Sequence, residues 1–439
     1  FHGWTRGAGL LQNQVPVGIS LEMASSQGVA QAVALCRPDV VCAYPISPQT
    51  HIVENLGLLC RKGVLQDCEY INVESEFAAM SVAIGASVAG GRAYTATASQ
   101  GLLYMAEAVY NASGLGLPVV MTVANRAIGA PINIWNDHSD SMSQRDCGWI
   151  QLFAETNQEA CDLHIQAFRI AEELSIPVMV CMDGFVLTHA FEAMDIPDQA
   201  DVDVFLPPYS PRQVLDPDHP YSIGAMVGPE AFTEVRWLAH EHMLAAIPVI
   251  ERTQKAFQKI FGRNSGGLLS NYCMEDAELA VFSMGALTGT IKDAVDEMRE
   301  AGQKIGVVTL KCFRPFPFVA VREALRHVSR VLVIERMMSA GGAGAVSLEV
   351  MKALKGTAVD QKTVYAGLGG RSVSKASFKK VFGAALRNEL QEDEFFLDLD
   401  RELLSRQLER EKTSRHIGPL PEALNRHVNE RKLARGEEI

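Results

Sequence analysis

The stretch CEYINVESEFAAMSVAIGASVAGG (residues 68–91) decides the fold, because a short β-type run passes directly into a helix of small and apolar residues. The same design recurs nearby, since DVVCAY (39–44), RAYTAT (92–97) and PVVMTVA (118–124) each predict a strand. None of these runs alternates polar and apolar residues, which is typical of strands buried on both faces of a parallel sheet. The helical patterns between them predict right-handed crossovers, so all four strands end at one edge of the sheet.

Polar side chains follow the four strands at that edge. They are Ser47 in the segment Pro45-Ile46-Ser47-Pro48, Glu76, the pair Ser99-Gln100, and Arg126. In open α/β sheets, ligands bind beyond the carboxyl ends of the strands. The sequence therefore predicts a binding site in which a hydroxyl, a carboxylate, a polar pair and a guanidinium converge.

Glu76 has two interpretations. An acidic residue in the first turn of a helix is stabilised by the helix dipole, by about 0.3–1 kcal/mol. Alternatively, the apolar residues Phe77 to Met80 desolvate the carboxylate and raise its pKa. A carboxyl group of this kind, sharing a proton with a bound heterocycle, is suited to proton transfer.

The other three positions also leave alternatives open. Ser47 before Pro48 is typical of a helix N-cap, which is also a place where an anion binds free N–H groups. Arg126 suits either a surface ion pair or, before the loop AIGAPINIW (127–135), a bidentate clamp for a carboxylate. Ser99-Gln100 predicts either a plain turn into a helix or a loop that donates amide hydrogen bonds.

Composition excludes several classes of function. The formal charge of −12 argues against a basic nucleic-acid surface, and no apolar run approaches the roughly 18 residues of a membrane helix. Nine scattered cysteines without a C-x-x-C pair indicate reduced thiols in a cytoplasmic protein. We therefore expect neither an iron–sulfur cluster nor zinc bound by this chain alone.

Three weaker motifs receive structural interpretations. Asp137-His138-x-Asp140 is more typical of a hydrogen-bonded loop than of a metal site, so we predict no metal there. Gly342-x-Gly344 and Gly367-x-Gly369 lack the spacing of a dinucleotide-binding fingerprint and predict tight turns between strand and helix.

The pattern divides the chain into five segments. We expect an N-terminal arm (1–23), a first α/β domain (24–194), a linker with a long helix (195–275), a second α/β domain (276–388) and a charged helical tail (389–439). The long helix is predicted at 229–261, bent at Pro248, and 304–313 predicts a single strand.

Five fragments together resemble the α subunit of one family, pyruvate:ferredoxin oxidoreductase, also called pyruvate synthase. They are AYPISPQTHIVENL (43–56), VESEFAAMSVAIGAS (73–87), TATASQGLLYMAEAVY (95–110), ANRAIGAPINIWNDHSDSMSQRDCGWIQLFAE (124–155) and FRPFP (313–317). The resemblance implies that the first domain is a thiamine-diphosphate-binding, pyrimidine-type domain with a doubly wound parallel sheet. It implies a second domain similar to the transketolase C-terminal domain. The implied activity is oxidative decarboxylation of pyruvate to acetyl-CoA and CO2, with electrons passing to ferredoxin.

The same resemblance implies roles for the residues at the sheet edge. Glu76 matches the glutamate that bonds the aminopyrimidine ring and drives its imino tautomer. Ser47, where the family usually has Thr, and Arg126 match the residues that hold the substrate carboxylate. Pro45, Ile46, Ser99 and Gln100 fall in cofactor-binding segments. Gln27 stands where the family typically has an acidic residue.

The chain lacks some parts of such an enzyme. It has no Gly-Asp-Gly motif for a diphosphate and its magnesium ion. The resemblance therefore implies that a β subunit completes the site with Mg2+ and a [4Fe-4S] cluster, while γ and δ subunits bring coenzyme A contacts and further clusters. Two alternatives remain, namely a sibling oxidoreductase for branched-chain oxoacids or oxalate, and a non-catalytic scaffold subunit.

Overall fold

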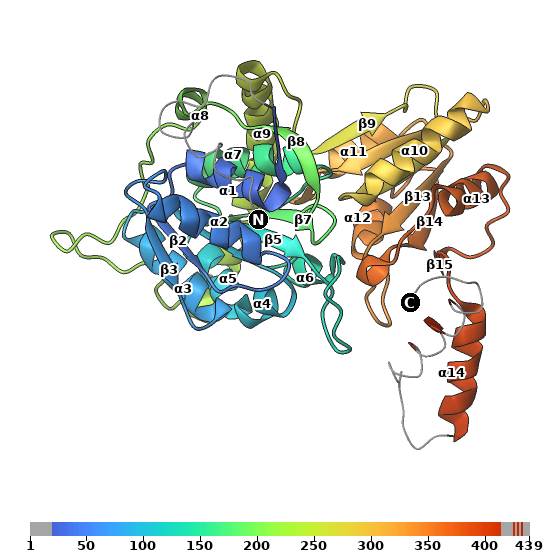
Figure 1. Ribbon diagram of the computed structural model, residues 1–439, viewed down its shortest axis with the longest axis horizontal. Helices are drawn as coiled ribbons and strands as arrows, with labels where there is room; N and C mark the ends of the chain where they lie inside the picture. The colour runs from blue at the N-terminus through green and yellow to red at the C-terminus, as the bar shows by residue number, and fades with distance from the viewer. Residues whose placement is uncertain (1–19, 414–424, 426–427, 430–431, 433–439) are drawn as a thin grey trace, which may run out of the picture.

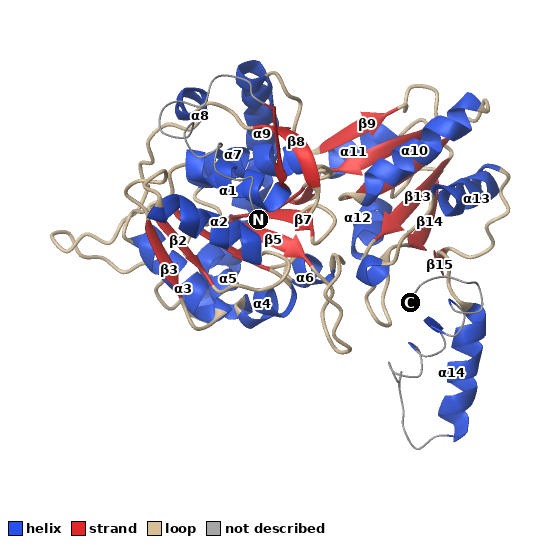
Figure 2. Ribbon diagram, in the orientation of Figure 1, coloured by secondary structure: helices blue, strands red, loops and turns tan. Residues whose placement is uncertain are grey.

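The computed structural model describes residues 20–413 together with 425, 428–429 and 432. Two α/β units, each built on its own sheet, lie side by side (Figure 1). Helices flank both sheets, as colouring by secondary structure shows (Figure 2). No helix among the described residues is long and apolar enough to cross a membrane.

The first sheet has seven strands in the order β12-β6-β7-β5-β4-β2-β3. The six strands from β2 to β7 are parallel, and β12 pairs antiparallel with β6. Their bounds are β2 (Val40–Ala43), β3 (Glu69–Asn72), β4 (Ala93–Thr97), β5 (Val120–Asn125), β6 (Ile150–Phe153), β7 (Val178–Asp183) and β12 (Cys312–Arg314). The four predicted strands are confirmed, and their carboxyl ends lie at one edge.

Burial along these strands follows their place in the sheet. Every residue of β4 and β5 is buried, as the absence of alternation predicted. The prediction is wrong for β3, whose four residues are exposed or half-buried. The reason is that β3 is the edge strand, so one side has no neighbouring strand to cover it.

Helices cover both faces of this sheet, which makes it doubly wound. One face packs against α1 (Ser25–Leu35), α2 (Thr50–Arg61) and α7 (Asn157–Leu174), and this core includes Phe168. The other face packs against α3 (Glu76–Val88), α4 (Ser99–Tyr104) and α5 (Ala106–Gly114). That second core continues into the other domain, because it also contains Phe282 and Val308.

The second sheet has six strands in the order β15-β14-β13-β10-β11-β9. They are β9 (Leu269–Tyr272), β10 (Leu279–Met284), β11 (Ile305–Leu310), β13 (Arg330–Glu335), β14 (Asp360–Tyr365) and β15 (Glu394–Phe396). Only β9 runs antiparallel to its neighbour. The helices of this domain are α10 (Leu287–Glu300), α11 (Phe318–Leu325), α12 (Ala345–Ala353) and α13 (Lys375–Leu386).

Four short strands differ from the predicted segments. β1 (Ser20–Ala24) straddles the end of the predicted arm and pairs with β8 (Phe191–Asp195). β9 lies in the predicted linker and β15 in the predicted tail, yet both belong to the second sheet. The predicted strand 304–313 is two strands, because the chain leaves the second sheet at Lys311 and β12 joins the first.

The linker holds α8 (Gln199–Phe205) and α9 (Pro229–Phe261). The predicted bounds of the long helix are confirmed, with Pro229 at its start, and the helix continues through Pro248. The charged tail contains α14 (Arg401–Thr413), as predicted. The described residues do not include 1–19 of the arm. Of the tail they do not include 414–439, apart from 425, 428–429 and 432.

Candidate active site at the carboxyl edge of the first sheet

Glu76 begins α3 directly after the turn that follows β3. Ser75 is the N-cap, and its hydroxyl accepts a hydrogen bond from the N–H of Ala78 at 3.2 Å. The Glu76 side chain is 7% exposed, and its carboxylate has no hydrogen bond or ion pair with any described residue. Its oxygens are not among the fully enclosed unpaired polar atoms of the described chain, so a ligand can still reach this carboxylate.

Gly101 on α4 makes room for this carboxylate. A Cβ atom at Gly101 would lie 2.6 Å from Oε1 of Glu76 and 2.6 Å from Oγ1 of Thr97. The expected shielding by Phe77 is wrong, because that ring is exposed and contacts Tyr104 instead. The carboxylate is therefore enclosed by a neighbouring strand end and helix.

Arg126 and Ser47 meet, as their positions after β5 and β2 predicted. Nη1 of Arg126 donates to the carbonyl oxygen of Ser47 at 2.9 Å, and Nε donates to the carbonyl of Asn133 at 3.4 Å. The guanidinium is mostly buried, and this burial lowers its pKa. Ser47 is exposed, and it contacts the guanidinium through its backbone carbonyl.

The N-cap interpretation of Ser47 is wrong. Helix α2 begins at Thr50, and Gln49 occupies the N-cap position. Residues 47–49 form a turn, which the N–H of Gln49 closes on the carbonyl of Ile46 at 2.9 Å. Pro45 and Ile46 precede this turn, the first exposed and the second half-buried.

Ser99 and Gln100 begin α4 at the end of β4. Ser99 is fully buried with φ of +50°, and its N–H donates to Oδ2 of Asp140 at 2.9 Å. That amide is therefore engaged within the protein. Gln100 faces the loop after β5, because a Cβ atom at Gly129 would lie 2.7 Å from its Nε2.

Asp140 organises this edge through hydrogen bonds, in agreement with the hydrogen-bonded loop that the sequence favoured over a metal site at residues 137–140. It is fully buried on α6 (Ser139–Ser143) and accepts four hydrogen bonds, from the backbone of Ser99 (2.9 Å), Arg126 (2.9 Å) and Ser141 (2.7 Å) and from the side chain of Asn125 (2.8 Å). Burial raises its pKa to about 6, although these hydrogen bonds lower it. Asp140 thus ties together the ends of β4 and β5.

Asp183 was not predicted from the sequence. It ends β7 and accepts hydrogen bonds from Nε2 of His138 at 2.9 Å and from the N–H of Ala286 at 2.6 Å. Arg336 of the second domain completes the group at 3.2 Å. Burial raises the pKa of Asp183, but Arg336 and His138 outweigh it and hold the pKa well below its usual range. His138 and Asp183 belong to the first domain, but Ala286 and Arg336 come from the second, so no local sequence pattern connects the whole group.

The remaining predictions from the sequence concern Gln27, metal binding and the two glycine pairs. Gln27 is exposed on α1. Among the described residues, no group of three or more His, Cys, Asp or Glu side chains is arranged for a metal ion. Both glycine pairs lie between a strand and a helix, as predicted; Gly367 and Gly369 have positive φ, whereas Gly342 and Gly344 do not.

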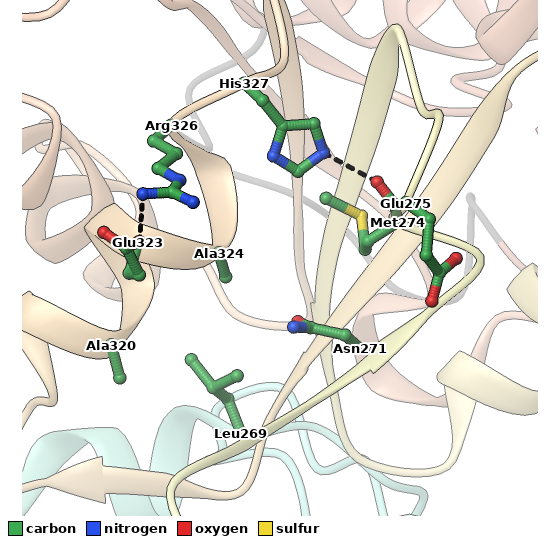
Figure 3. Close-up of a pocket in the computed structure, with 9 residues that line it drawn as sticks. All are labelled: Leu269, Asn271, Met274, Glu275, Ala320, Glu323, Ala324, Arg326 and His327. Carbon is green, nitrogen blue, oxygen red and sulfur yellow. Dashed lines mark hydrogen bonds and ion pairs between the residues drawn. The ribbon is translucent and has the colours of Figure 1, made fainter.

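A separate hollow of about 440 Å3 lies on the second domain between β9 and α11 (Figure 3). Its basic side chains are already engaged, because Arg326 pairs with Glu323 at 2.5 Å and His327 bonds the carbonyl of Met274 at 2.6 Å. The residues that line it are Leu269, Asn271, Met274, Glu275, Ala320, Glu323, Ala324, Arg326 and His327. It shares no residue with the site at the sheet edge.

These geometries define a doubly wound α/β protein with an acid, a guanidinium and a hydroxyl at the carboxyl edge of its first sheet. Residues 31–255 match the family described as "Pyruvate flavodoxin/ferredoxin oxidoreductase, thiamine diP-bdg". Residues 277–378 match "Pyruvate:ferredoxin oxidoreductase core domain II". The chain therefore belongs to the pyruvate:ferredoxin oxidoreductase family.

Individual relatives agree with this assignment. The chain is 46% identical over 387 residues to "Pyruvate synthase subunit PorA" of Methanosarcina barkeri, which covers 86% of this chain and 96% of the relative. It is 43% identical to the subunit of the same name from Pyrococcus abyssi, over 80% of this chain and 90% of the relative. It is 38% identical to "Ketoisovalerate oxidoreductase subunit VorA" of Pyrococcus horikoshii, over 82% of this chain and 92% of the relative.

Solved structures share the fold. A 2-oxoglutarate:ferredoxin oxidoreductase from Magnetococcus marinus superposes with a TM-score of 0.61 and 16% identity, over 85% of this chain and 65% of that one. A split-gene transketolase superposes with a TM-score of 0.51 and 12% identity, over 84% of this chain and all of that one. The predicted fold class, a pyrimidine-type domain followed by a transketolase C-terminal-like domain, is confirmed.

Proposed function

We propose that this chain is the α subunit of a pyruvate:ferredoxin oxidoreductase and contributes one half of its thiamine diphosphate site. The observation that carries the proposal is Glu76, a mostly buried residue that lies against Gly101 and whose carboxylate has no hydrogen bond or ion pair within the described part of the chain. An aminopyrimidine ring nitrogen is a suitable partner, because it shares a proton with a carboxyl group. The match of residues 31–255 to a thiamine-diphosphate-binding family supports the same cofactor.

Each residue has a role in this proposal. Glu76 holds the shared proton at the ring nitrogen, and the segments around Pro45-Ile46 and Ser99-Gln100 line the ring. The guanidinium of Arg126 and the hydroxyl of Ser47 hold the carboxylate of pyruvate by charge-assisted and neutral hydrogen bonds. When bound, the cofactor supplies a carbon nucleophile for the 2-oxo carbon and an electron sink for decarboxylation.

The proposed enzyme needs partner subunits. Since the sequence has no Gly-Asp-Gly motif and no C-x-x-C pair, a β subunit would hold the diphosphate, Mg2+ and a [4Fe-4S] cluster. Subunits γ and δ would bring contacts to coenzyme A and the clusters that reduce ferredoxin. The products would be acetyl-CoA and CO2, and the reaction is reversible in principle.

The test uses the anaerobically purified native complex. Coenzyme-A-dependent reduction of a viologen dye is measured with pyruvate, 2-oxoglutarate, a branched-chain oxoacid and oxalate. We expect pyruvate to lead by at least tenfold in kcat/KM, equivalent to about 1.4 kcal/mol. Glu76→Gln in the reassembled complex should lose roughly 10²–10⁴-fold in kcat. Unchanged activity in that variant would instead support a scaffold subunit.

One other substrate class has specific support. The ketoisovalerate subunits are 38–39% identical to this chain over 82% of its length. Ser47 carries one methyl group fewer than the threonine usual in the family, so the pocket has additional room beside Arg126. A branched-chain oxoacid that outperforms pyruvate would favour this candidate and leave the role of Glu76 unchanged.

A further inference from the structure

The loop that directly follows Arg126 is held by the second domain. This loop, residues 127–138, we call the site loop. It is closed by a hydrogen bond from the N–H of Ala127 to the carbonyl of Trp135 at 3.0 Å. Its tip is poorly covered, since Ile132 is 77% exposed and Trp135 53%. The contacts that fix this tip must therefore come from specific polar bonds rather than from burial in the first domain.

The first of these contacts involves the glycine turn η1 (Leu368–Gly370) between β14 and α13. Nδ2 of Asn133 donates to the carbonyl of Gly369 at 3.0 Å. In the opposite direction, the N–H of Gly369 donates to Oδ2 of Asp137 at 2.9 Å. The site loop and the glycine turn thus bond reciprocally at two points, although more than 200 residues separate them in sequence.

The approach is so close that only glycine fits in the turn. A Cβ atom at Gly369 would lie 2.5 Å from Nδ2 of Asn133, and one at Gly370 would lie 2.4 Å from Cβ of Trp135. Both glycines also have positive φ. A side chain at Gly370 must push the site loop away from the second domain, whereas one at Gly369 would displace the Asn133 amide.

The base of the site loop is fixed by a second group. The N–H of His138 donates to the carbonyl of Arg336 at 3.0 Å, and the Arg336 side chain pairs with Asp183. In the amide orientation that satisfies both groups, Asn136 accepts from the same guanidinium at 2.6 and 2.9 Å. All four side chains are buried, so this group is shielded from water.

Asn133 connects these contacts to the substrate clamp. Its side-chain amide donates to the carbonyl of Gly369, while its backbone carbonyl accepts a hydrogen bond from Nε of Arg126 at 3.4 Å. Arg126 in turn donates to the carbonyl of Ser47. A continuous series of contacts therefore runs from the second domain to the two residues that we assign to the substrate carboxylate.

We propose that the second domain sets the geometry of the substrate clamp through Asn133, which is a positioning residue for Arg126. This inference rests on the proposed function. A bidentate pair with a carboxylate depends on sub-ångström placement of the guanidinium. A shift of the site loop therefore weakens binding of the 2-oxoacid, and leaves the cofactor contacts at Glu76 in place.

The experiment compares Gly370→Ala with Gly341→Ala in the complete oxidoreductase complex. Both positions have positive φ, so both variants carry the same backbone strain, but a Cβ at Gly341 meets no atom within 4 Å. We expect Gly370→Ala to raise KM for pyruvate at least tenfold relative to Gly341→Ala, with kcat changed less than twofold. Thiamine diphosphate affinity, measured by calorimetry, should be equal in both variants. Hydrogen exchange of residues 127–138 should be faster only in Gly370→Ala.

A second variant covers the case in which Gly370→Ala does not fold. Asn133→Ala removes the amide that bonds Gly369 but keeps the carbonyl that Arg126 uses, and we expect the same rise in KM. Equal KM in Gly370→Ala and Gly341→Ala, or an unchanged KM in Asn133→Ala, would overturn the inference. Failure of the unmodified complex to turn over pyruvate would instead overturn the proposed function, so the two failures are distinguishable.

Discussion

Asp140 gives the site a pH dependence that differs from that of folding. Burial raises its pKa to about 6, above the ordinary value of 3.8. The ionisable groups that face it are Arg126 and the thiol of Cys181. Between pH 6 and 3.8 the folded protein binds more protons at this group than the unfolded chain. Its contribution to the free energy of unfolding therefore increases as the pH falls through that range.

The site itself should respond in the opposite direction. A protonated Asp140 cannot accept all four of its hydrogen bonds, so Arg126 and Ser99 lose their fixed positions. We expect kcat/KM for pyruvate to fall below an apparent pKa near 6. In Asp140→Asn this acid limb should disappear, with kcat/KM low at every pH. Parallel thermal melts are the control, because a melting temperature that falls together with kcat/KM would assign the acid limb to unfolding.

Residues that directly follow strands could be predicted from the sequence, and residues contributed by other elements could not. Glu76 and Arg126 lie where the strand pattern placed them, because parallel strands bring their carboxyl ends together. Asp140 reaches the same edge from a five-residue helix within a long connection. Asp183 is the last residue of β7, but its partner Arg336 belongs to the other domain, which no local pattern reveals.

At the scale of elements, the contact between α3 and α4 decides the position of Glu76. Gly101→Ala places a methyl group 2.6 Å from its carboxylate, so α3 or the side chain must move. A displacement of about 1 Å at a catalytic group costs on the order of 10²-fold in rate. We expect a loss of that size in kcat of the reassembled complex, measured by dye reduction.

Gly85→Ala is the matched control for this prediction. Gly85 lies on the exposed side of α3, the helix that begins at Glu76, and a Cβ there meets no atom within 4 Å. This variant should stabilise the fold by about 0.5–1 kcal/mol and leave the rate unchanged. Equal rates for Gly101→Ala and Gly85→Ala would contradict the assignment of Glu76 to catalysis.

Long or fully buried elements were predictable, and the two short edge strands of the second sheet were not. β4, β5 and α9 have strong patterns, and Pro229 marks the start of its helix. By contrast, LSNY in β9 and EFF in β15 are short and partly exposed, so neither has the apolar run that indicates a buried strand. Their place is set by the free edges of the second sheet, a property of the assembled domain.

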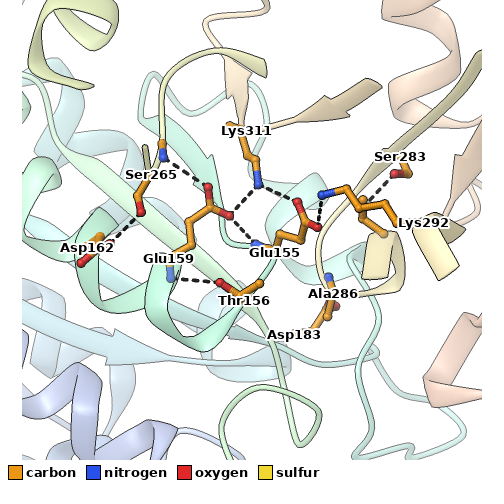
Figure 4. A network of polar contacts seen from close by, with 12 residues as sticks. Glu155, Thr156, Glu159, Asp162, Asp183, Ser265, Ser283, Ala286, Lys292 and Lys311 are labelled. Carbon is orange, nitrogen blue, oxygen red and sulfur yellow. Dashed lines mark hydrogen bonds and ion pairs between the residues drawn. The ribbon is translucent and has the colours of Figure 1, made fainter. Parts of the chain in front are cut away.

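At the scale of the whole molecule, the two domains share a strand and a buried charge cluster. Lys311 lies where the chain passes from β11 of the second sheet to β12 of the first. Its Nζ contacts Glu155 at 2.9 Å and Glu159 at 2.6 Å, and Lys292 also pairs with Glu155 (Figure 4). The sequence predicted one continuous strand through this position, because the exchange between sheets depends on partners more than 150 residues away.

Breaking this cluster should destabilise the joined domains. Lys311→Met removes the cation that Glu155 and Glu159 share. Removing one member of a buried ion pair lowers the free energy of unfolding by about 3–5 kcal/mol. Lys304→Met is the control, since its pair with Glu278 is exposed on both sides and contributes at most about 1 kcal/mol. Denaturant midpoints at pH 7 compare the two variants, and equal midpoints would contradict a structural role for the cluster.

The pH dependence of unfolding provides a sharper test of the same cluster. Burial raises the pKa of Glu155, but Lys311 and Lys292 outweigh it, so the pKa lies below its ordinary value. This group therefore stabilises the folded protein above pH 4.5, and the stabilisation is lost as the pH falls through the lowered pKa. Without Lys311, Lys292 alone opposes burial at Glu155, so the pKa of this carboxylate rises and less stability is lost on acidification. Lowering the pH through 4.5 should therefore destabilise Lys311→Met less than Lys304→Met. An equal acid response in Lys311→Met and Lys304→Met would show that Lys311 does not control this carboxylate.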